Sequence, residues 1–201
     1  MKNEVKKVLY LSYTGMTDPL GQSQVLAYLK RLSQIGQYQF TIISFEKKEA
    51  FSRLQSVIEQ LCNEAGIVWY PLSYTAKPPV LSTFRDVERM KKLAMKLVKE
   101  HRYSVVHCRS YIPSLVGLQL KRKLGTPFLF DMRGFWADER IDGAIWNTSN
   151  PVFNLIYKFF KQKERQFLLE ADHVVSLTQN AKDEIPGSRS EERRVGKECR
   201  S

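Results

Sequence analysis

Cysteine is scarce in this chain of 201 residues, which contains only three. Cys62 and Cys108 lie far apart, and Cys199 lies close to the C-terminus. This spacing fits neither a disulfide framework nor a cysteine-based metal site. We therefore expect a protein of the reducing cytoplasm that binds no metal ion.

Long apolar runs are also missing. The basic N-terminal segment is followed by an apolar run that covers only residues 8–11. Such a run is too short for a signal peptide or a membrane span, so the body of the protein is expected to be soluble. No internal repeat is visible either.

The best-known phosphate-binding fingerprints are absent where they would be expected. The loop after the first β-rich run contains neither G-x-G-x-x-G nor G-x-x-x-x-G-K-[ST]. An ordinary dinucleotide-binding or P-loop protein is therefore not indicated.

Positive charge, in contrast, is abundant: 32 Lys and Arg residues against 21 Asp and Glu residues give a net charge of +11. This excess favours anionic partners such as phosphates, anionic lipid surfaces or nucleic acid. Nucleic acid is the least favoured of these, because the basic residues are scattered over several predicted helices and no nucleic-acid-binding motif occurs.

The C-terminal residues 189–201 differ from the rest of the chain, since they are highly charged and show no apolar periodicity. Residues 189–199 resemble the translation of a sequencing adapter, and a natural charged terminus is the alternative. We therefore interpret residues 1–188 as one domain and residues 189–201 as a non-native tail.

Six β-rich runs alternate with helical patterns along the chain. The runs cover residues 8–13, 40–45, 67–70, 105–107, 127–130 and 173–177, and the helical patterns cover residues 25–35, 51–64, 87–101, 113–124 and 152–169. This alternation predicts an α/β fold, a Rossmann-like doubly wound parallel sheet with helices on both faces. Ligands of such sheets bind at the carboxyl ends of the strands, so the loops there hold the candidate site residues.

The first of these loops covers residues 14–24. Gly15 and Gly21 let the backbone approach a ligand closely, because neither has a Cβ. Gly21, Gln22 and Ser23 are expected to open the first helix, whose N-terminus would bind a phosphate or a sugar hydroxyl together with Asp18. The alternative is an ordinary capped turn.

Arg109 and Ser110 follow the fourth β-rich run. The guanidinium of Arg109 would suit a phosphate or carboxylate, although an ion pair on a helix face is an equal alternative. His107 ends an apolar run and is interpreted as a structural histidine, with a role in proton transfer as the alternative.

The loop after the fifth run concentrates polar side chains. Asp131 would act as a base or orient a hydroxyl, and Arg133 would keep it ionised or hold a donor phosphate. Trp136 would pack against a sugar ring, with Gly134 and Glu139 beside it. The alternative is a purely structural Asp–Arg network.

Three blocks of the sequence resemble the N-terminal half of family-4 glycosyltransferases: residues 9–45, which include Asp-Pro-Leu-Gly-Gln-Ser-Gln, residues 105–139 and residues 171–178. The resemblance implies a GT-B fold in which this half binds mainly the acceptor and a C-terminal half binds a nucleotide sugar. It also implies transfer with retained anomeric configuration, no cofactor and no protein-bound metal. Asp131 holds the position of a histidine that many members place at the reacting centre. A chain without the C-terminal half would be inactive alone.

The resemblance further implies roles in polysaccharide biosynthesis of the cell envelope, with lipid-linked acceptors at the inner face of the membrane. The helical segment 152–169 would contact that surface, or it would simply be core on one side and solvated charge on the other. The alternative function is a non-catalytic nucleotide- or phosphosugar-binding module. The transferase hypothesis requires Gly15, Gly21, Arg109, Asp131 and Arg133 to converge on one edge of one sheet.

Overall fold

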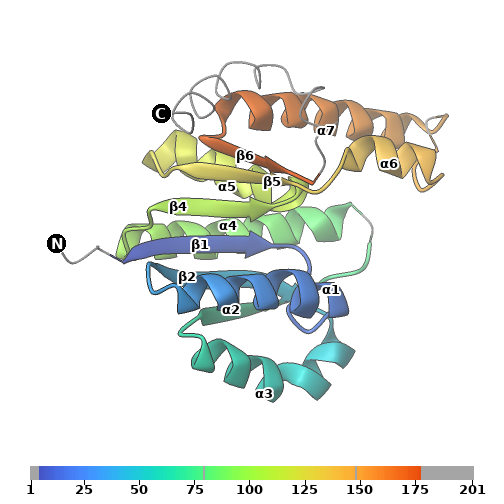
Figure 1. Ribbon diagram of the computed structural model, residues 1–201. Helices are drawn as coiled ribbons and strands as arrows, with labels where there is room; N and C mark the ends of the chain where they lie inside the picture. The colour runs from blue at the N-terminus through green and yellow to red at the C-terminus, as the bar shows by residue number, and fades with distance from the viewer. Residues whose placement is uncertain (1–4, 79, 148, 178–201) are drawn as a thin grey trace.

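The computed structural model describes residues 5–78, 80–147 and 149–177. The predicted tail at 189–201, and the loop at 178–180 that follows the last β-rich run at the carboxyl edge of the sheet, lie outside these residues. Figure 1 shows a single parallel sheet whose strands end on the same side. Its six strands follow the order β3-β2-β1-β4-β5-β6, so the predicted α/β, doubly wound, Rossmann-like fold is confirmed.

The strands lie close to the predicted runs. Their bounds are β1 Lys6–Ser12, β2 Tyr38–Glu46, β3 Val68–Ser73, β4 Val105–Arg109, β5 Phe128–Met132 and β6 His173–Ser176. All neighbouring pairs are parallel. The central strands are buried on both faces, which explains why they read as continuous apolar runs.

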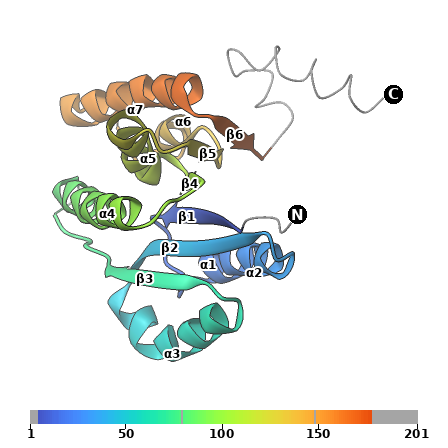
Figure 2. The same ribbon diagram turned by 90° about the vertical axis from the view of Figure 1, so that its left-hand side faces the viewer.

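Helices cover the sheet on two sides (Figure 2). Their bounds are α1 Pro19–Gly21, a π-helical segment η1 Gln22–Leu26, α2 Ala27–Gln34, α3 Lys48–Glu64, α4 Leu81–Glu100, α5 Tyr111–Leu124, α6 Trp136–Asp142 and α7 Pro151–Glu170. Helices α4, α5 and α7 lie on one side of the sheet and α1 and α2 on the other (Figure 2).

Two apolar clusters form the core, one on each face. Leu9 and Leu11 of β1 belong to the cluster beneath α4, α5 and α7, whereas Val8 and Tyr10 belong to the cluster beneath α2 and α3. This division follows from the alternation of side chains along a strand.

The structure differs from the expected elements at a few places that matter for the site. Strand β3 continues through Pro71, although we expected it to stop there. Because β3 is an edge strand, the missing N–H of proline can face away from the sheet. Strand β5 includes Asp131, and the segment from Trp136 is helix α6 rather than loop.

Candidate functional site

The carboxyl ends of β1, β4 and β5 bring the predicted polar residues side by side. In the sheet register Ser12 of β1 pairs with Arg109 of β4, which in turn pairs with Asp131 of β5. Parallel neighbours end at the same edge of a sheet, so the order β1-β4-β5 is what joins these residues.

The Asp131 carboxylate lies at the centre of a cluster of cationic and polar groups. It is 3.4 Å from Nε2 of His107, 3.9 Å from Nη1 of Arg109 and 3.7 Å from Nη1 of Arg133. The Asp131 side chain is 8% exposed and that of Arg133 is 28% exposed. The carboxylate is thus nearly covered, and Arg133 is its most accessible neighbour.

Gln24 of η1 holds the guanidinium groups of both arginines in place. Its Oε1 accepts hydrogen bonds from Nη2 of Arg109 at 2.7 Å and from Nη2 of Arg133 at 3.1 Å. Arginine carries five N–H donors, so each guanidinium still has donors available for a ligand. The first helical segment therefore supports the cluster through Gln24, a residue that we did not predict as part of the site.

Tyr10 contacts the cluster through His107. Its ring lies against the ring of His107, with a centroid distance of 4.4 Å. Burial raises the pKa of the Tyr10 hydroxyl well above its ordinary value, and the nearby charge of Asp131 raises it further. Tyr10 therefore stays neutral beneath the charged groups.

The loop after β1 is held by a buried carboxylate from the next strand. Glu46, at the end of β2, accepts hydrogen bonds from the backbone N–H groups of Met16 and Thr17 at 2.8 and 3.0 Å. The hydroxyls of Thr17 and Ser44 donate to the same carboxylate at 2.6 and 2.5 Å. These bonds determine the path of the chain between β1 and α1.

The two predicted glycines are required by contacts within the chain. A Cβ on Gly15 would lie 2.5 Å from Oε2 of Glu46, and a Cβ on Gly21 would lie 1.9 Å from the carbonyl oxygen of Gly15. The helix begins at Pro19, so Gly21 lies inside it and packs on the loop. Packing therefore explains both glycines, and a ligand beside them stays a prediction.

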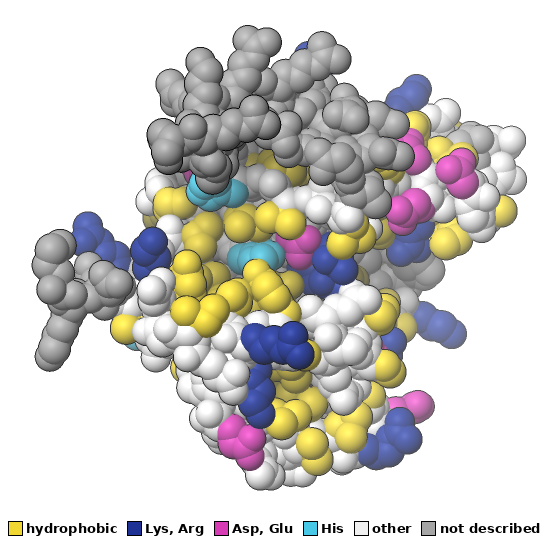
Figure 3. Space-filling view, viewed as in Figure 1, with side chains coloured by type: hydrophobic (Ala, Val, Ile, Leu, Met, Phe, Trp, Pro, Cys, Tyr) yellow, Lys and Arg dark blue, Asp and Glu magenta, His cyan; other side chains and the backbone are white. Residues whose placement is uncertain are grey.

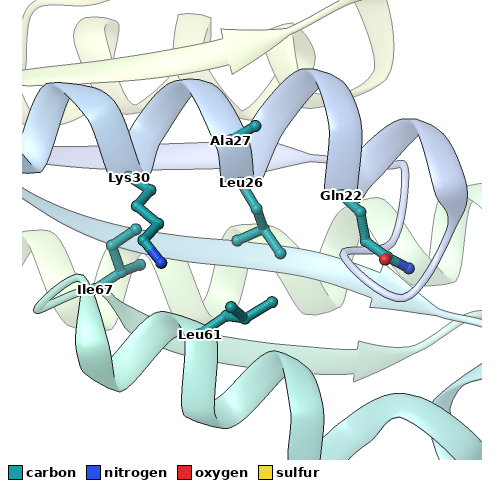
Figure 4. Close-up of a pocket in the computed structure, with 6 residues that line it drawn as sticks. All are labelled: Gln22, Leu26, Ala27, Lys30, Leu61 and Ile67. Carbon is teal, nitrogen blue, oxygen red and sulfur yellow. The ribbon is translucent and has the colours of Figure 1, made fainter.

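Asp18, Gln22 and Ser23 contact groups other than those of the Asp131 cluster. Asp18 forms an ion pair with Lys47 at 3.1 Å, Gln22 donates to the Thr17 carbonyl oxygen, and Ser23 donates to that of Pro19. Asp18 and Gln22 line a depression of about 330 Å³ between α1 and the start of α3. Gln22 also borders an apolar groove of about 220 Å³ between α2 and α3 (Figure 4).

Ser110 joins β4 to α5 in a strained conformation. Its φ of 67° and ψ of −172° lie in a region that is almost reserved for glycine. The Ser110 N–H donates to the carbonyl oxygen of Asp131 at 2.8 Å, and this bond holds the turn against β5. Backbone strain of this kind is concentrated at functional sites.

Trp136, Gly134 and Glu139 are placed differently from our expectation of a single sugar-binding loop. Trp136 begins α6 and stacks on Tyr111 at 5.7 Å, with the Arg140 guanidinium 4.8 Å from its ring centre. Glu139 lies over Gly134, where a Cβ would approach its Oε1 to 2.1 Å. The contacts of Trp136 are thus with other protein groups, and its stacking on a sugar stays a prediction.

The cluster reaches the surface in a small area. Figure 3 shows a histidine with an acidic and a basic side chain beside it, among apolar side chains, in the middle of one face. Among the described residues, no three His, Cys, Asp or Glu side chains are grouped so that they could hold a metal ion. The groups that the cluster offers to a ligand are guanidinium donors beside a nearly covered carboxylate.

Three residues in or beside the cluster were not among the candidate site residues. His107, interpreted as structural, lies 3.4 Å from Asp131, and Gln24 and Glu46 were given no role. A carboxylate at the end of a buried strand is a sequence pattern from which a role for Glu46 can be predicted. No local sequence pattern predicts the contacts of Gln24, because its partners Arg109 and Arg133 lie far from it in the sequence.

Comparison with known proteins gives a family and a fold. The sequence profile of Glycosyltransferase Family 4 matches residues 21–195. No curated protein matches the chain.

Among solved structures, UGT2 of Phytolacca americana has a TM-score of 0.53 at 11% identity, covering 92% of this chain and 48% of its own. MurG of Acinetobacter baumannii has a TM-score of 0.41 at 18% identity, covering 63% of this chain and 35% of its own. The chain thus spans about half of the UGT2 chain and about a third of the MurG chain.

At such low identity, structural likeness shows the fold alone. A C-terminal domain of the PF1911 hydrogenase from Pyrococcus furiosus has a TM-score of 0.45 at 15% identity, covering 62% of this chain and 89% of its own. The family profile is more specific, and it covers most of the sequence, including Gln24, Arg109, Asp131 and Arg133. The chain belongs to Glycosyltransferase Family 4.

Proposed function

We propose that this chain is the acceptor-side half of a glycosyltransferase that moves a sugar from a nucleotide-sugar donor to a hydroxyl of a saccharide or a lipid-linked saccharide. The observation that carries the proposal is the cluster of Asp131, Arg109 and Arg133 at the carboxyl ends of β4 and β5. Family membership supports the same reaction class.

In this proposal the two arginines bind the donor's phosphate groups. Planar guanidinium groups form two parallel hydrogen bonds to phosphate, and Gln24 already holds both groups in place before a ligand arrives. Preorganised cations at the leaving phosphate stabilise the negative charge that develops there during transfer. Arg133 is the more exposed of the two and is therefore the more accessible to the phosphate.

Asp131 orients these cations in the proposed mechanism. Its carboxylate has His107, Arg109 and Arg133 around it and is almost covered, which suits an orienting role better than that of a base. The remaining accessible edge of the carboxylate would accept a hydrogen bond from a substrate hydroxyl.

We further propose that transfer retains the anomeric configuration, needs no protein-bound metal and no cofactor, and requires a C-terminal half that binds the nucleotide sugar. The site would then lie between the two halves, in the cytoplasm. NMR analysis of the product's anomeric proton tests retention, and activity in the presence of EDTA tests the metal requirement.

The central experiment uses the complete enzyme, which contains this chain and its sugar-nucleotide half, with a panel of nucleotide sugars. We expect Arg133→Ala to lower kcat/KM by about tenfold to a hundredfold, because a charge-assisted hydrogen bond contributes about 1.5–3 kcal/mol. Asp131→Asn should lower kcat by a similar factor, since the arginines lose their counter-charge.

Arg102→Ala is the matched control, because Arg102 is an exposed arginine that precedes β4 and so lies at the opposite edge of the sheet. Its rate should equal that of the unmodified enzyme. Near-normal rates for both Arg133→Ala and Asp131→Asn, in proteins that melt normally, would remove the cluster from the mechanism.

A further inference from the structure

Helix α7 carries charged side chains on the side that packs against the rest of the protein. It spans 20 residues, and neither α7 nor any other described helix is long and apolar enough to cross a membrane. Figures 1 and 2 show α7 lying along α5 and α6, and residues of these helices are in contact. Glu164 of α7 is buried, and the side chain of Lys161 is 34% exposed. Because an unpaired buried charge is costly, the partners of these two residues show what the inner side of α7 does.

The carboxylate of Glu164 joins α7 to α5. It accepts a hydrogen bond from the hydroxyl of Tyr111, the first residue of α5. Tyr111 is fully buried and directly follows Ser110, whose N–H donates to the carbonyl oxygen of Asp131. The contact with Glu164 therefore holds the start of α5 beside the end of β5.

The ammonium of Lys161 joins α7 to α6. It donates to Oδ2 of Asp138 at 2.8 Å and to Oε1 of Glu164 at 2.6 Å. Asp138 also accepts a hydrogen bond from the hydroxyl of Tyr157 at 2.9 Å. The same ammonium lies 5.8 Å from the ring centre of Phe135, the residue at the N-cap of α6. These contacts hold the start of α6.

The network ties together the two segments that carry the guanidinium groups of the candidate site. Arg109 lies two residues before Tyr111, and Arg133 lies two residues before Phe135. The two guanidinium groups lie 3.9 and 3.7 Å from the carboxylate of Asp131. The separation of the guanidinium groups therefore depends on how α5 and α6 are held against α7.

Charged groups are a poor source of stability at this place in the core. The ring of Tyr111 packs on Phe130 and Phe167, with centroid distances of 5.6 and 6.2 Å. Loss of hydration offsets most of the attraction within a buried ion pair, and apolar side chains of similar size often stabilise a protein more. Directed hydrogen bonds do, however, fix the spacing of the elements that they join. The network is therefore better explained by the geometry that it imposes than by its contribution to stability.

We infer that Lys161 and Glu164 are positioning residues, which set the separation of Arg109 and Arg133 for the phosphate groups of a nucleotide sugar. The inference rests on the proposed function of the Asp131 cluster. A displacement of about 1 Å at a reacting centre can lower a rate about a hundredfold. An anchor behind the two segments would thus act on the reaction without touching the substrate.

The test is a double-mutant cycle in the complete enzyme, with the nucleotide sugar of the panel that gives the highest rate. Lys161→Met should lower kcat/KM about tenfold or more, because the guanidinium groups lose their fixed spacing. Lys161→Arg keeps the charge and the donors, so it should retain most of the activity. In the Arg133→Ala enzyme, Lys161→Met should lower kcat/KM by less than about threefold further, because its effect passes through Arg133.

A second variant and a matched control complete the experiment. Tyr111→Phe removes only the hydroxyl that bonds to Glu164, and with Arg109→Ala it gives a second cycle in case Lys161→Met does not fold. Lys158→Met removes the same charge from an exposed position of α7 and should leave kcat/KM unchanged. Thermal melting checks that every variant folds.

The possible outcomes separate this inference from the proposed function. A residue that serves stability alone would change the melting temperature and would lower kcat/KM by equal factors with and without Arg133, which would overturn the inference. A normal rate for Lys161→Met beside a slow Arg133→Ala enzyme would also overturn it and would leave the proposed function intact. Normal rates for Arg133→Ala and Asp131→Asn would overturn the proposed function, and the inference with it.

Discussion

Two buried carboxylates at the strand ends carry out different tasks. Asp131 is surrounded by the imidazole of His107 and the guanidinium groups of Arg109 and Arg133, so its partners are charged or ionisable. Glu46 has neutral donors as partners, including two backbone N–H groups. Asp131 is therefore suited to organise cations for a ligand, whereas Glu46 organises the backbone of the loop after β1.

At this scale we predict that Glu46→Ala destabilises the protein by about 3 kcal/mol or more. The substitution leaves the N–H groups of Met16 and Thr17 buried without an acceptor, and each such group costs about 1–3 kcal/mol. Urea unfolding measures the change. Glu49→Ala, at an exposed position three residues further on, should change stability by less than about 0.5 kcal/mol. Equal effects of the two substitutions would contradict this role.

The first helical element links the packing of the fold to the site. Segments α1 and η1 carry Gly21 at the contact with the loop and Gln24 at the contact with both arginines. The π-helical segment η1 begins directly after Gly21 and contains Gln24, and such segments often occur at functional sites. The position of Gln24 over the cluster thus depends on how closely α1 approaches Gly15.

At the scale of this element, Gly21→Ala should destabilise the protein by about 1–3 kcal/mol, the usual cost of overpacking. Alanine favours helix over glycine by about 1 kcal/mol, but its Cβ would lie 1.9 Å from the Gly15 carbonyl oxygen, so the clash dominates. Chemical denaturation shows whether the substitution lowers or raises the free energy of unfolding. Ser23→Ala, an exposed change in the same helical region, is the control, and a stabilised Gly21→Ala protein would refute the close approach.

For the molecule as a whole, several buried groups keep their protons more firmly than they would in the unfolded chain. Burial raises the pKa of the Cys62 thiol from its ordinary 9.0 to about 11, and it raises the pKa of Cys108 as well. Burial also raises the pKa of Tyr10 and Tyr111 above the ordinary value of a phenol. Each group favours the folded state only while it remains neutral.

This gives a prediction for alkaline pH. Above about pH 9 the unfolded chain loses the Cys62 proton while the folded protein retains it up to about pH 11, so the unfolded state binds fewer protons. The free energy of unfolding should therefore decrease as the pH rises through this range. Urea titrations across it measure the slope, and Cys62→Val should make the slope shallower. A flat profile would be inconsistent with the burial of these groups.

The local pattern of the sequence was sufficient to predict the parallel sheet and the edge at which the polar residues meet. Alternating β-rich and helical runs require this architecture, and Arg109 and Asp131 follow apolar runs that must be strands. Of the five residues that we expected to converge, Arg109, Asp131 and Arg133 lie together. Gly15 and Gly21 lie against each other in the segment after β1.

Only the tertiary structure decided which groups touch. The strand order places β1 between β2 and β4, which brings Tyr10 against His107 and lets Gln24 reach both arginines. It also placed Trp136 in an aromatic cluster instead of an open loop. The physical reason is that hydropathy and turn signals act over a few residues, whereas strand order and side-chain contacts depend on the packing of segments far apart in the chain.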